Sequence, residues 1–181
     1  MSWYEFLLFV HVSCAVIWIG GDFLFQVQGQ LVLRGGDAAE IARFTGNAGR
    51  LSERLFVPAA LLVLLAGIGL MIEGSWSWGT LWIVFALVTF AGSFALGLGV
   101  LSPTAKKIEA VGPETPEGQQ LIRRLFALLR VDLVFLFAIV FAMSVKPTGD
   151  DSWTLVVAAA IVLVLSAAFL RGARAPVTAV G

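Results

Sequence analysis

The chain has 181 residues, of which 59% are hydrophobic and 13% charged, and its mean hydropathy is +0.94. About a quarter of the residues in soluble domains are charged, so this composition excludes an ordinary soluble domain and indicates an integral membrane protein. Twelve basic and twelve acidic residues give a net charge of zero, which leaves no basic excess for binding nucleic acid. A single cysteine and a single histidine exclude an intrachain disulfide and a CxxC-type metal cage.

The N-terminal apolar stretch lacks the features of a secretion signal. The first basic residue is Arg34, so no positively charged region precedes the stretch, which is also longer than the apolar core of a signal. We therefore expect it to be retained as a membrane-spanning helix.

Five segments approach the roughly 20 apolar residues that a helix needs to cross about 30 Å of hydrocarbon. They lie near residues 3–26, 55–72, 82–101, 125–145 and 153–170. The sequence shows no internal repeat and no separate soluble segment. We therefore predict an all-α, polytopic membrane helical bundle with five transmembrane helices in a single domain, residues 1–181.

The basic residues predict the orientation of this bundle, because lysine and arginine resist translocation. Eleven of the twelve lie on one side, in the first connector, the third connector and the C-terminal tail: Arg34, Arg43, Arg50, Arg54, Lys106, Lys107, Arg123, Arg124, Arg130, Arg171 and Arg174. Only Lys146 lies on the other side. This asymmetry predicts an outer N-terminus and a cytoplasmic C-terminus, in a multi-pass protein of the inner (plasma) membrane.

Aromatic residues support the same boundaries. Trp3, Tyr4, Trp76, Trp78 and Trp153 fall at the outer ends of their predicted helices, where an interfacial aromatic belt is expected.

The cytoplasmic connectors contain helix signals. Asp37 followed by Glu40 predicts a helix start, and Ser52 or Glu53 is expected to cap the second span, with Pro58 in its first turn. Residues 112–116 must form a loop, and the pattern after it predicts an amphipathic stretch that leads into the fourth span.

The first helix concentrates its unusual chemistry on one face. His11, Trp18 and Asp22 stand at helical spacings of seven and four residues, with Cys14 or Ala15 between them and Gln26 beyond. His11 lies about 12 Å below the outer interface if the helix starts at Trp3. Three interpretations stay open for it: a neutral imidazole hydrogen-bonded to a neighbouring helix, a ligand of haem iron or copper, or a proton relay. Trp18 by itself is more typical of packing than of chemistry.

Four charged residues fall at comparable depth near the cytoplasmic side: Asp22, Arg34, Arg130 and Asp132. Unpaired charges inside the hydrocarbon boundary are unfavourable. We therefore expect at least one Asp–Arg pair between the first and fourth spans. The alternative is that both aspartates lie in the headgroup zone, where such a pair would contribute little.

The opening helix resembles a known pattern. Its His-x6-Trp-x-Gly-Gly segment, from His11 through Trp18 to Gly21, is similar to the first helix of HemJ-type protoporphyrinogen oxidases, of CopD-like copper-resistance membrane proteins and of an uncharacterised family of predicted integral membrane proteins. The last of these is the most similar in size. The likeness to HemJ continues through Ser52-Glu53-Arg54-Leu55 and Pro58 to Trp78 and Trp82.

The resemblance implies a helical bundle in which the residue matching His11 is a haem ligand, as in HemJ. HemJ also has a functional lysine in its third helix, whereas residues 81–86 here contain neither His nor Lys, which puts protoporphyrinogen oxidation in doubt. Copper is the alternative metal, with Cys14, Met71 and Met143 as the soft ligands on the side of His11. Methionines in such positions also serve as gap-fillers.

We therefore expect His11 to be the axial ligand of a b-type haem, with Trp18 packed against the porphyrin. The iron would be five-coordinate, or bind Met71 or Met143, or bind a second His11 across a homodimer. Such a protein would be a redox carrier in electron transport or an accessory to respiratory or haem metabolism. The alternative is a non-catalytic subunit or assembly factor of a larger membrane complex. Whether the chain is an enzyme stays open, and no catalytic motif favours it. The expected partners are the lipid bilayer and a homo-oligomer or larger complex.

Overall fold

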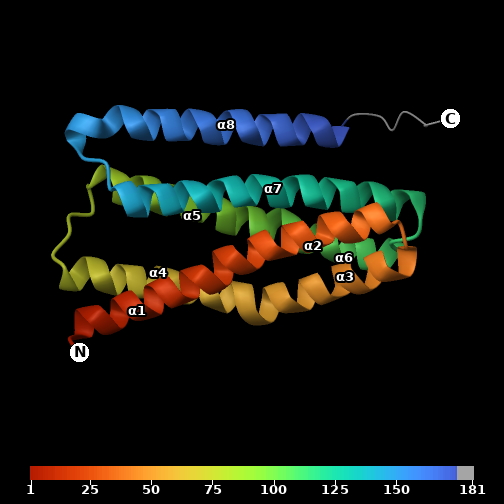
Figure 1. Cartoon of the computed structure of the whole chain (residues 1–181), viewed down its shortest axis with the longest axis horizontal. Helices are drawn as coiled ribbons and strands as arrows, with labels where there is room; N and C mark the ends of the chain where they lie inside the picture. The colour runs from red at the N-terminus through yellow and green to blue at the C-terminus, as the bar shows by residue number, and fades with distance from the viewer. Residues whose placement is uncertain (175–181) are drawn as a thin grey trace.

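The computed structural model describes residues 1–174, and every regular element in that part of the chain is a helix (Figure 1). Five helices in the described part are long and apolar enough to cross a membrane: Trp3–Gly35, Ala39–Glu73, Leu81–Val111, Pro116–Val145 and Gly149–Arg171. The predicted all-α membrane bundle is therefore confirmed. Residues 175–181, which complete the expected single domain 1–181, lie outside the described residues.

Three of the five helices contain a short π-helical segment that divides them into two labelled parts. The first consists of α1 (Trp3–Ala15) and α2 (Gly21–Gly35), the second of α3 (Ala38–Leu51) and α4 (Val57–Glu73), and the third of α5 (Leu81–Leu96) and α6 (Ser102–Val111). The fourth is α7 (Pro116–Val145). A 3-10 turn, Gly149–Asp151, leads into the fifth, α8 (Ser152–Arg174).

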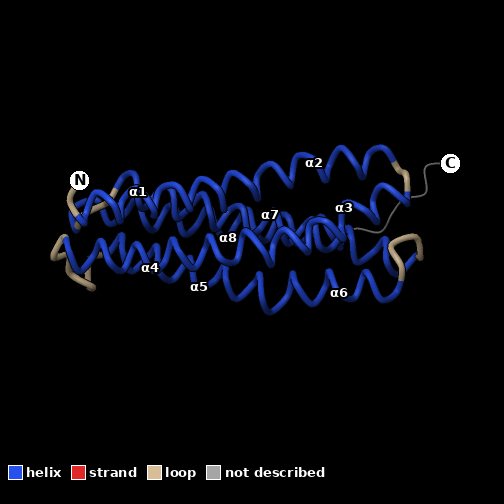
Figure 2. Tube along the Cα trace, turned by 90° about the horizontal axis from the view of Figure 1, so that it is seen from below, coloured by secondary structure: helices blue, strands red, loops and turns tan. Residues whose placement is uncertain are grey.

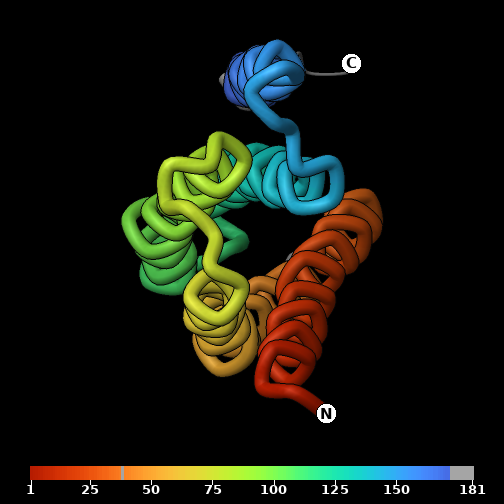
Figure 3. The backbone as a smooth tube through the Cα atoms, turned by 90° about the vertical axis from the view of Figure 1, so that its left-hand side faces the viewer, coloured from red at the N-terminus to blue at the C-terminus, as the bar shows by residue number. Residues whose placement is uncertain are grey.

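The first four helices enclose the core, and α8 lies outside them against α7 (Figure 3). Figure 2 shows the connecting loops at the two ends of the bundle, with the N-terminus at one end and the end of α8 directed toward the other. This alternation agrees with five crossings. Which end faces the cytoplasm stays a prediction from the basic residues.

The helices are longer than the predicted spans. The first two have 33 and 35 residues, which corresponds to about 50 Å at 1.5 Å per residue, against about 30 Å of hydrocarbon. The excess lies at the end that bears most of the basic residues. There Ile108, Ile122, Leu125 and Phe126 form a buried cluster of their own. The predicted connectors are therefore largely a helical extension of the bundle, which we call the stem.

The expected cap at Ser52 or Glu53 is wrong, because the helix continues through this position. Residues Ser52–Phe56 form a π-helical turn in which the N–H of Val57 donates to the carbonyl of Ser52. The wider turn comes directly before Pro58, whose ring would otherwise clash with a carbonyl of the preceding turn. A second π-helical turn, Gly97–Leu101, stands in the same relation to Pro103.

Two other local predictions are confirmed. Asp37 caps α3, where its carboxylate accepts the N–H groups of Ala39 and Glu40 at 2.8 and 3.3 Å. Gly36, at φ 73°, makes the turn between α2 and α3, which favours glycine. The loop before α7 ends at Pro116, in the first turn of the helix, and α7 then continues through the amphipathic stretch into the fourth span.

Large apolar side chains cover the outside of the bundle. Val88 is 67% exposed, Val156 69% and Leu163 71%, and many similar residues surround them. A soluble protein rarely exposes contiguous apolar surface on this scale. These side chains therefore form the lipid-facing surface of a membrane-embedded bundle.

Candidate functional site

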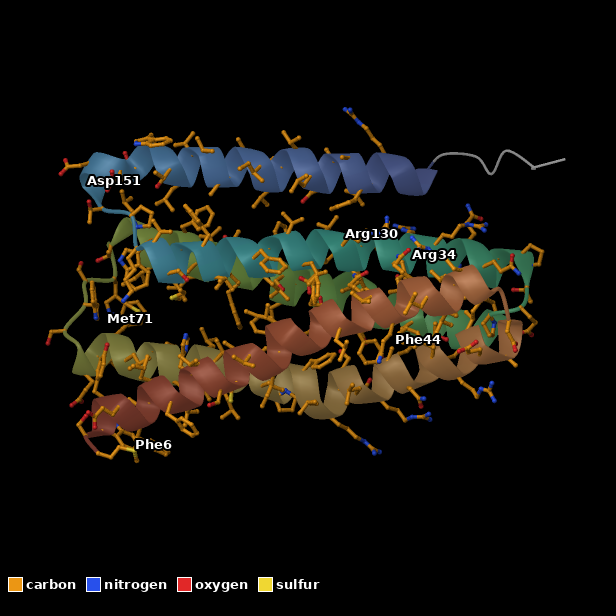
Figure 4. All side chains as sticks on the ribbon, viewed as in Figure 1. Phe6, Arg34, Phe44, Met71, Arg130 and Asp151 are labelled. Carbon is orange, nitrogen blue, oxygen red and sulfur yellow. The ribbon has the colours of Figure 1, made fainter. Side chains whose placement is uncertain are left out.

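A cavity of about 570 Å³ lies in the half of the bundle nearest the N-terminus, between α1, α4, α5 and α7. Most of its wall is apolar. Its lining includes every residue predicted to bind a cofactor: His11, Trp18, Met71 and Met143. Figure 4 places Met71 toward this end of the bundle, and Arg34, Phe44 and Arg130 in the half that leads to the opposite end. The structure therefore brings the four predicted cofactor residues to one cavity.

His11 is half-buried on α1 and is held by α4. Its Nδ1 lies 2.8 Å from the carbonyl oxygen of Val63. Because a carbonyl only accepts, Nδ1 carries the proton and Nε2 carries the lone pair. The ring can approach α4 because residue 67 is glycine, where a Cβ would lie 3.1 Å from Cε1 of His11 and 3.3 Å from Nδ1. The imidazole is thus fixed as the tautomer that can bind a metal through Nε2.

Trp18 lines the cavity toward the stem. It is 7% exposed and lies in the π-helical segment Val16–Gly20. Its ring packs edge-to-face against the ring of Phe90, with 5.4 Å between the ring centroids. It belongs to a buried cluster with Ala59, Ala60, Val63, Leu136 and Ile139. This apolar layer separates the cavity from the half of the bundle that leads to the stem.

The two methionines line the cavity from two different helices. Met71, on α4, is buried beside Trp82 and Ile83. Met143, on α7, is half-buried and packs against both this cluster and the cluster around Trp18. Each thioether sulfur is a soft ligand for iron or copper. Cys14, the third soft residue considered, packs against the cluster around Trp18 and is not among the residues that line the cavity.

Lys146 stands at the end of the cavity nearer the N-terminus and supplies positive charge there. Its Nζ lies 5.5 Å from the ring centroids of both Trp76 and Trp82. Lys146 also takes a left-handed backbone conformation, at φ 49°, where it ends α7. In the sequence, Lys146 stands out as the one basic residue on the predicted outer side.

The four predicted charged residues do not pair as expected. The ion pairs within 4.0 Å in the described part of the chain are Lys106–Glu53 at 3.9 Å and Lys107–Glu117 at 2.8 Å, both exposed. Asp132 instead accepts a hydrogen bond of 2.5 Å from Ser93. The guanidinium of Arg130 lies 5.9 Å from the ring of Phe169, on α8. The predicted Asp–Arg pair between the first and fourth spans is therefore wrong. Residues 130 and 132 point about 160° apart on α7, so that Asp132 faces Ser93 on α5 and Arg130 faces Phe169 on α8.

Sequence reasoning also missed the residues that position His11. Among the described residues, no three His, Cys, Asp or Glu side chains lie close enough together to hold a metal ion. The partners of His11 are a backbone carbonyl at Val63 and the open space beside Gly67. A backbone carbonyl has no sequence signature, and a glycine in a membrane helix has many explanations.

One comparison with known proteins identifies the family. The family described as "Predicted integral membrane protein (DUF2269)" matches residues 5–147, which include nearly all of the first four helices and every cavity-lining residue except Tyr4. The chain therefore belongs to this family, as the resemblance of its first helix predicted. Neither the search of curated proteins nor that of solved structures gave a match. The similarity to HemJ and CopD proteins remains a resemblance of motifs.

Proposed function

We propose that the chain binds one b-type haem in the cavity beneath Lys146, with Nε2 of His11 as an axial ligand. The observation that supports this most is the Nδ1 hydrogen bond of His11 to the carbonyl of Val63. Metal-binding histidines usually donate their second ring N–H to a carbonyl or carboxylate, which fixes the ring and strengthens it as a ligand. A cavity of about 570 Å³ is also within the range of cofactor sites.

The remaining lining residues suit the other parts of a haem. Trp18 and Phe90 offer aromatic surface to the macrocycle. Lys146 offers a cation to the propionates at the end nearer the N-terminus. Met143 lies on α7, a helix other than the two that hold His11, and would be the thioether available as a second ligand. Copper, the alternative metal, would find fewer soft ligands in this cavity, because Cys14 does not line it.

A bound haem would supply one-electron exchange between ferrous and ferric iron. The functional class that follows is a membrane redox carrier, or an accessory of respiratory or haem metabolism. The chain's own residues would hold the group, orient it through His11 and exclude water with an apolar wall. No residue is assigned a catalytic role.

A second function is supported by the same hydrogen bond. The Val63 carbonyl satisfies the imidazole without any ligand, as expected of a structural histidine in a non-catalytic subunit or assembly factor. The outward surface of α8, which packs mainly on α7, would then be open to a larger complex or a second copy.

The colour of the purified protein separates these functions. The chain is expressed in haem-replete cells and extracted in detergent, and its absorbance is recorded together with its iron and copper content. We expect a Soret band that is lost in His11→Ala and kept in Cys14→Ala, a matched control on the same helix that does not line the cavity. A colourless wild-type protein, or a band that His11→Ala leaves unchanged, would contradict haem ligation by His11.

A further inference from the structure

A buried polar site lies on the far side of the apolar layer, and it contains none of the residues proposed to bind haem. It consists of Asp22 and Gln26 on α2, Asp132 on α7 and Ser93 on α5. These side chains are 8%, 6%, 7% and 2% exposed. Ser93 and Asp132 stand about 18–20 Å from the ends of α5 and α7 near the N-terminus, so they lie in the half of about 30 Å of hydrocarbon that is nearer the stem.

The hydrogen bonds of this site are incomplete. Ser93 donates to Oδ1 of Asp132 at 2.5 Å. Oδ2 of Asp22 is buried without a partner in the described part of the chain, and so are both amide atoms of Gln26, one turn further along the same face of α2. Buried polar atoms are normally hydrogen-bonded, so atoms without a partner are candidates for binding a water, an ion or a proton. The site thus has free hydrogen-bonding atoms that a bound ligand could satisfy.

The charges around Asp22 identify that ligand as a proton. Asp22 lies on α2, which packs against α7, the helix of Asp132, and both carboxyls are buried. Arg130, on the same helix, faces Phe169, and Glu53 and Arg54, in the turn before α4, are exposed. Two carboxylates that share a buried site without a cation cannot both stay ionised. One bound proton removes the repulsion and supplies the missing hydrogen.

Polar side chains connect this site with one side of the membrane only. Asp22, Gln26, Gln30 and Arg34 follow at intervals of four residues along α2, from the buried pair to the exposed Arg34 about 18 Å away. Nε2 of Gln30 is also buried without a partner in the described residues. Toward the cavity, the path is closed by the apolar layer of Trp18, Leu136 and their neighbours.

We propose that Asp22 and Asp132 form a proton-binding site that exchanges its proton with the stem side of the membrane along Gln26 and Gln30. The proton resides on Asp22, because Asp132 already accepts the hydroxyl hydrogen of Ser93. A hydronium ion at the stem surface donates the proton, and the same path returns it. The two halves of the bundle therefore have separate chemistry: the cavity of His11 in one half and a proton site in the other.

Modification by dicyclohexylcarbodiimide tests the site, since this apolar reagent reacts with protonated carboxyl groups buried in membranes. The full chain is reconstituted in sealed vesicles of known orientation, and peptide mass spectrometry locates the adduct. We expect the adduct on Asp22, several-fold less of it in Asp132→Asn at the same pH, and no change in Asp150→Asn, an exposed control. No adduct on Asp22, or equal modification in Asp132→Asn, would overturn the proposal.

The same vesicles test the path and the identity of the ligand. Acidifying the compartment that faces Arg34 should raise the modification of Asp22 several-fold, and acidifying the other compartment should not. A response to the other compartment overturns the path. Protection of Asp22 by sodium at constant pH overturns the proton as ligand. Asp22→Asn, which resembles the protonated acid in shape and charge, should unfold at the wild-type temperature; a large loss of stability would also overturn the proposal.

Discussion

Replacement of Gly67 by alanine tests the hydrogen bond that orients His11. A Cβ at residue 67 would lie 3.1 Å from Cε1 of His11 and 3.3 Å from Nδ1, which is closer than ordinary van der Waals contact. The ring is already held by Val63 at 2.8 Å, so it can move only by weakening that bond. A hydrogen bond of this kind contributes about 0.5–1.5 kcal/mol.

Gly69→Ala is the matched control, two residues along the same helix. Its Cβ would meet only the methyl end of Leu7, which is flexible, at 2.9 Å. Both substitutions gain about 0.5–1 kcal/mol from the higher helix propensity of alanine, so this gain cancels in the comparison and leaves the contact with His11 against the contact with the flexible end of Leu7. We expect Gly67→Ala to be less stable than Gly69→Ala by about 0.5–1.5 kcal/mol, and to bind haem about two- to tenfold more weakly.

Thermal unfolding in detergent measures the difference in stability, and titration with haem measures the difference in haem affinity. Both variants are also made in the His11→Ala background, where the difference between them should disappear if the imidazole is its cause. Equal stability and equal haem binding of the two glycine variants would refute the reasoning. A difference that persists without His11 would refute it as well.

Three further predictions concern the buried polar pair, the second iron ligand and the orientation of the chain. Ser93→Ala removes the hydroxyl that donates a hydrogen bond to Asp132, and it should lower the free energy of unfolding by about 0.5–2 kcal/mol. Thr89→Ala, whose hydroxyl donates to a carbonyl of its own helix, should lower it less. An equal loss in the two variants would contradict the role of the Ser93–Asp132 hydrogen bond. Met143→Leu should change the absorbance spectrum of the haem protein and Met71→Leu should not, and the reverse result would exchange their roles. A C-terminal reporter should report the cytoplasm, because eleven of the twelve basic residues lie on that side, and activity only on the outer side would invert the bundle.

The spans were predictable because their signal is strong and local. A run of about 20 apolar residues in hydrocarbon must form a helix to satisfy its backbone hydrogen bonds, and tryptophans at the membrane interface mark the ends of these runs. The stem was not predicted as a continuation of the helices, because its charged residues are typical of connectors outside the hydrocarbon. Its apolar positions, such as Ile108 and Phe126, recur at helical spacing but become a core only when two connectors meet.

The candidate site was predictable in its residues and only partly in its contacts. His11 and Trp18 stood out as rare chemistry on one helix face, and both line the cavity. The Asp–Arg pair failed because depth in the membrane says nothing about the direction of a side chain around its helix. Arg130 and Asp132 share a depth and face different neighbours, Phe169 and Ser93.

Titration of the purified, haem-free protein with haem tests the central claim most directly. We expect the wild-type chain to develop a saturable Soret band at about one haem per chain, Cys14→Ala to behave in the same way, and His11→Ala to show no saturable band. Saturation of His11→Ala with the same stoichiometry and spectrum as the wild-type protein would contradict the assignment of His11 as the axial ligand.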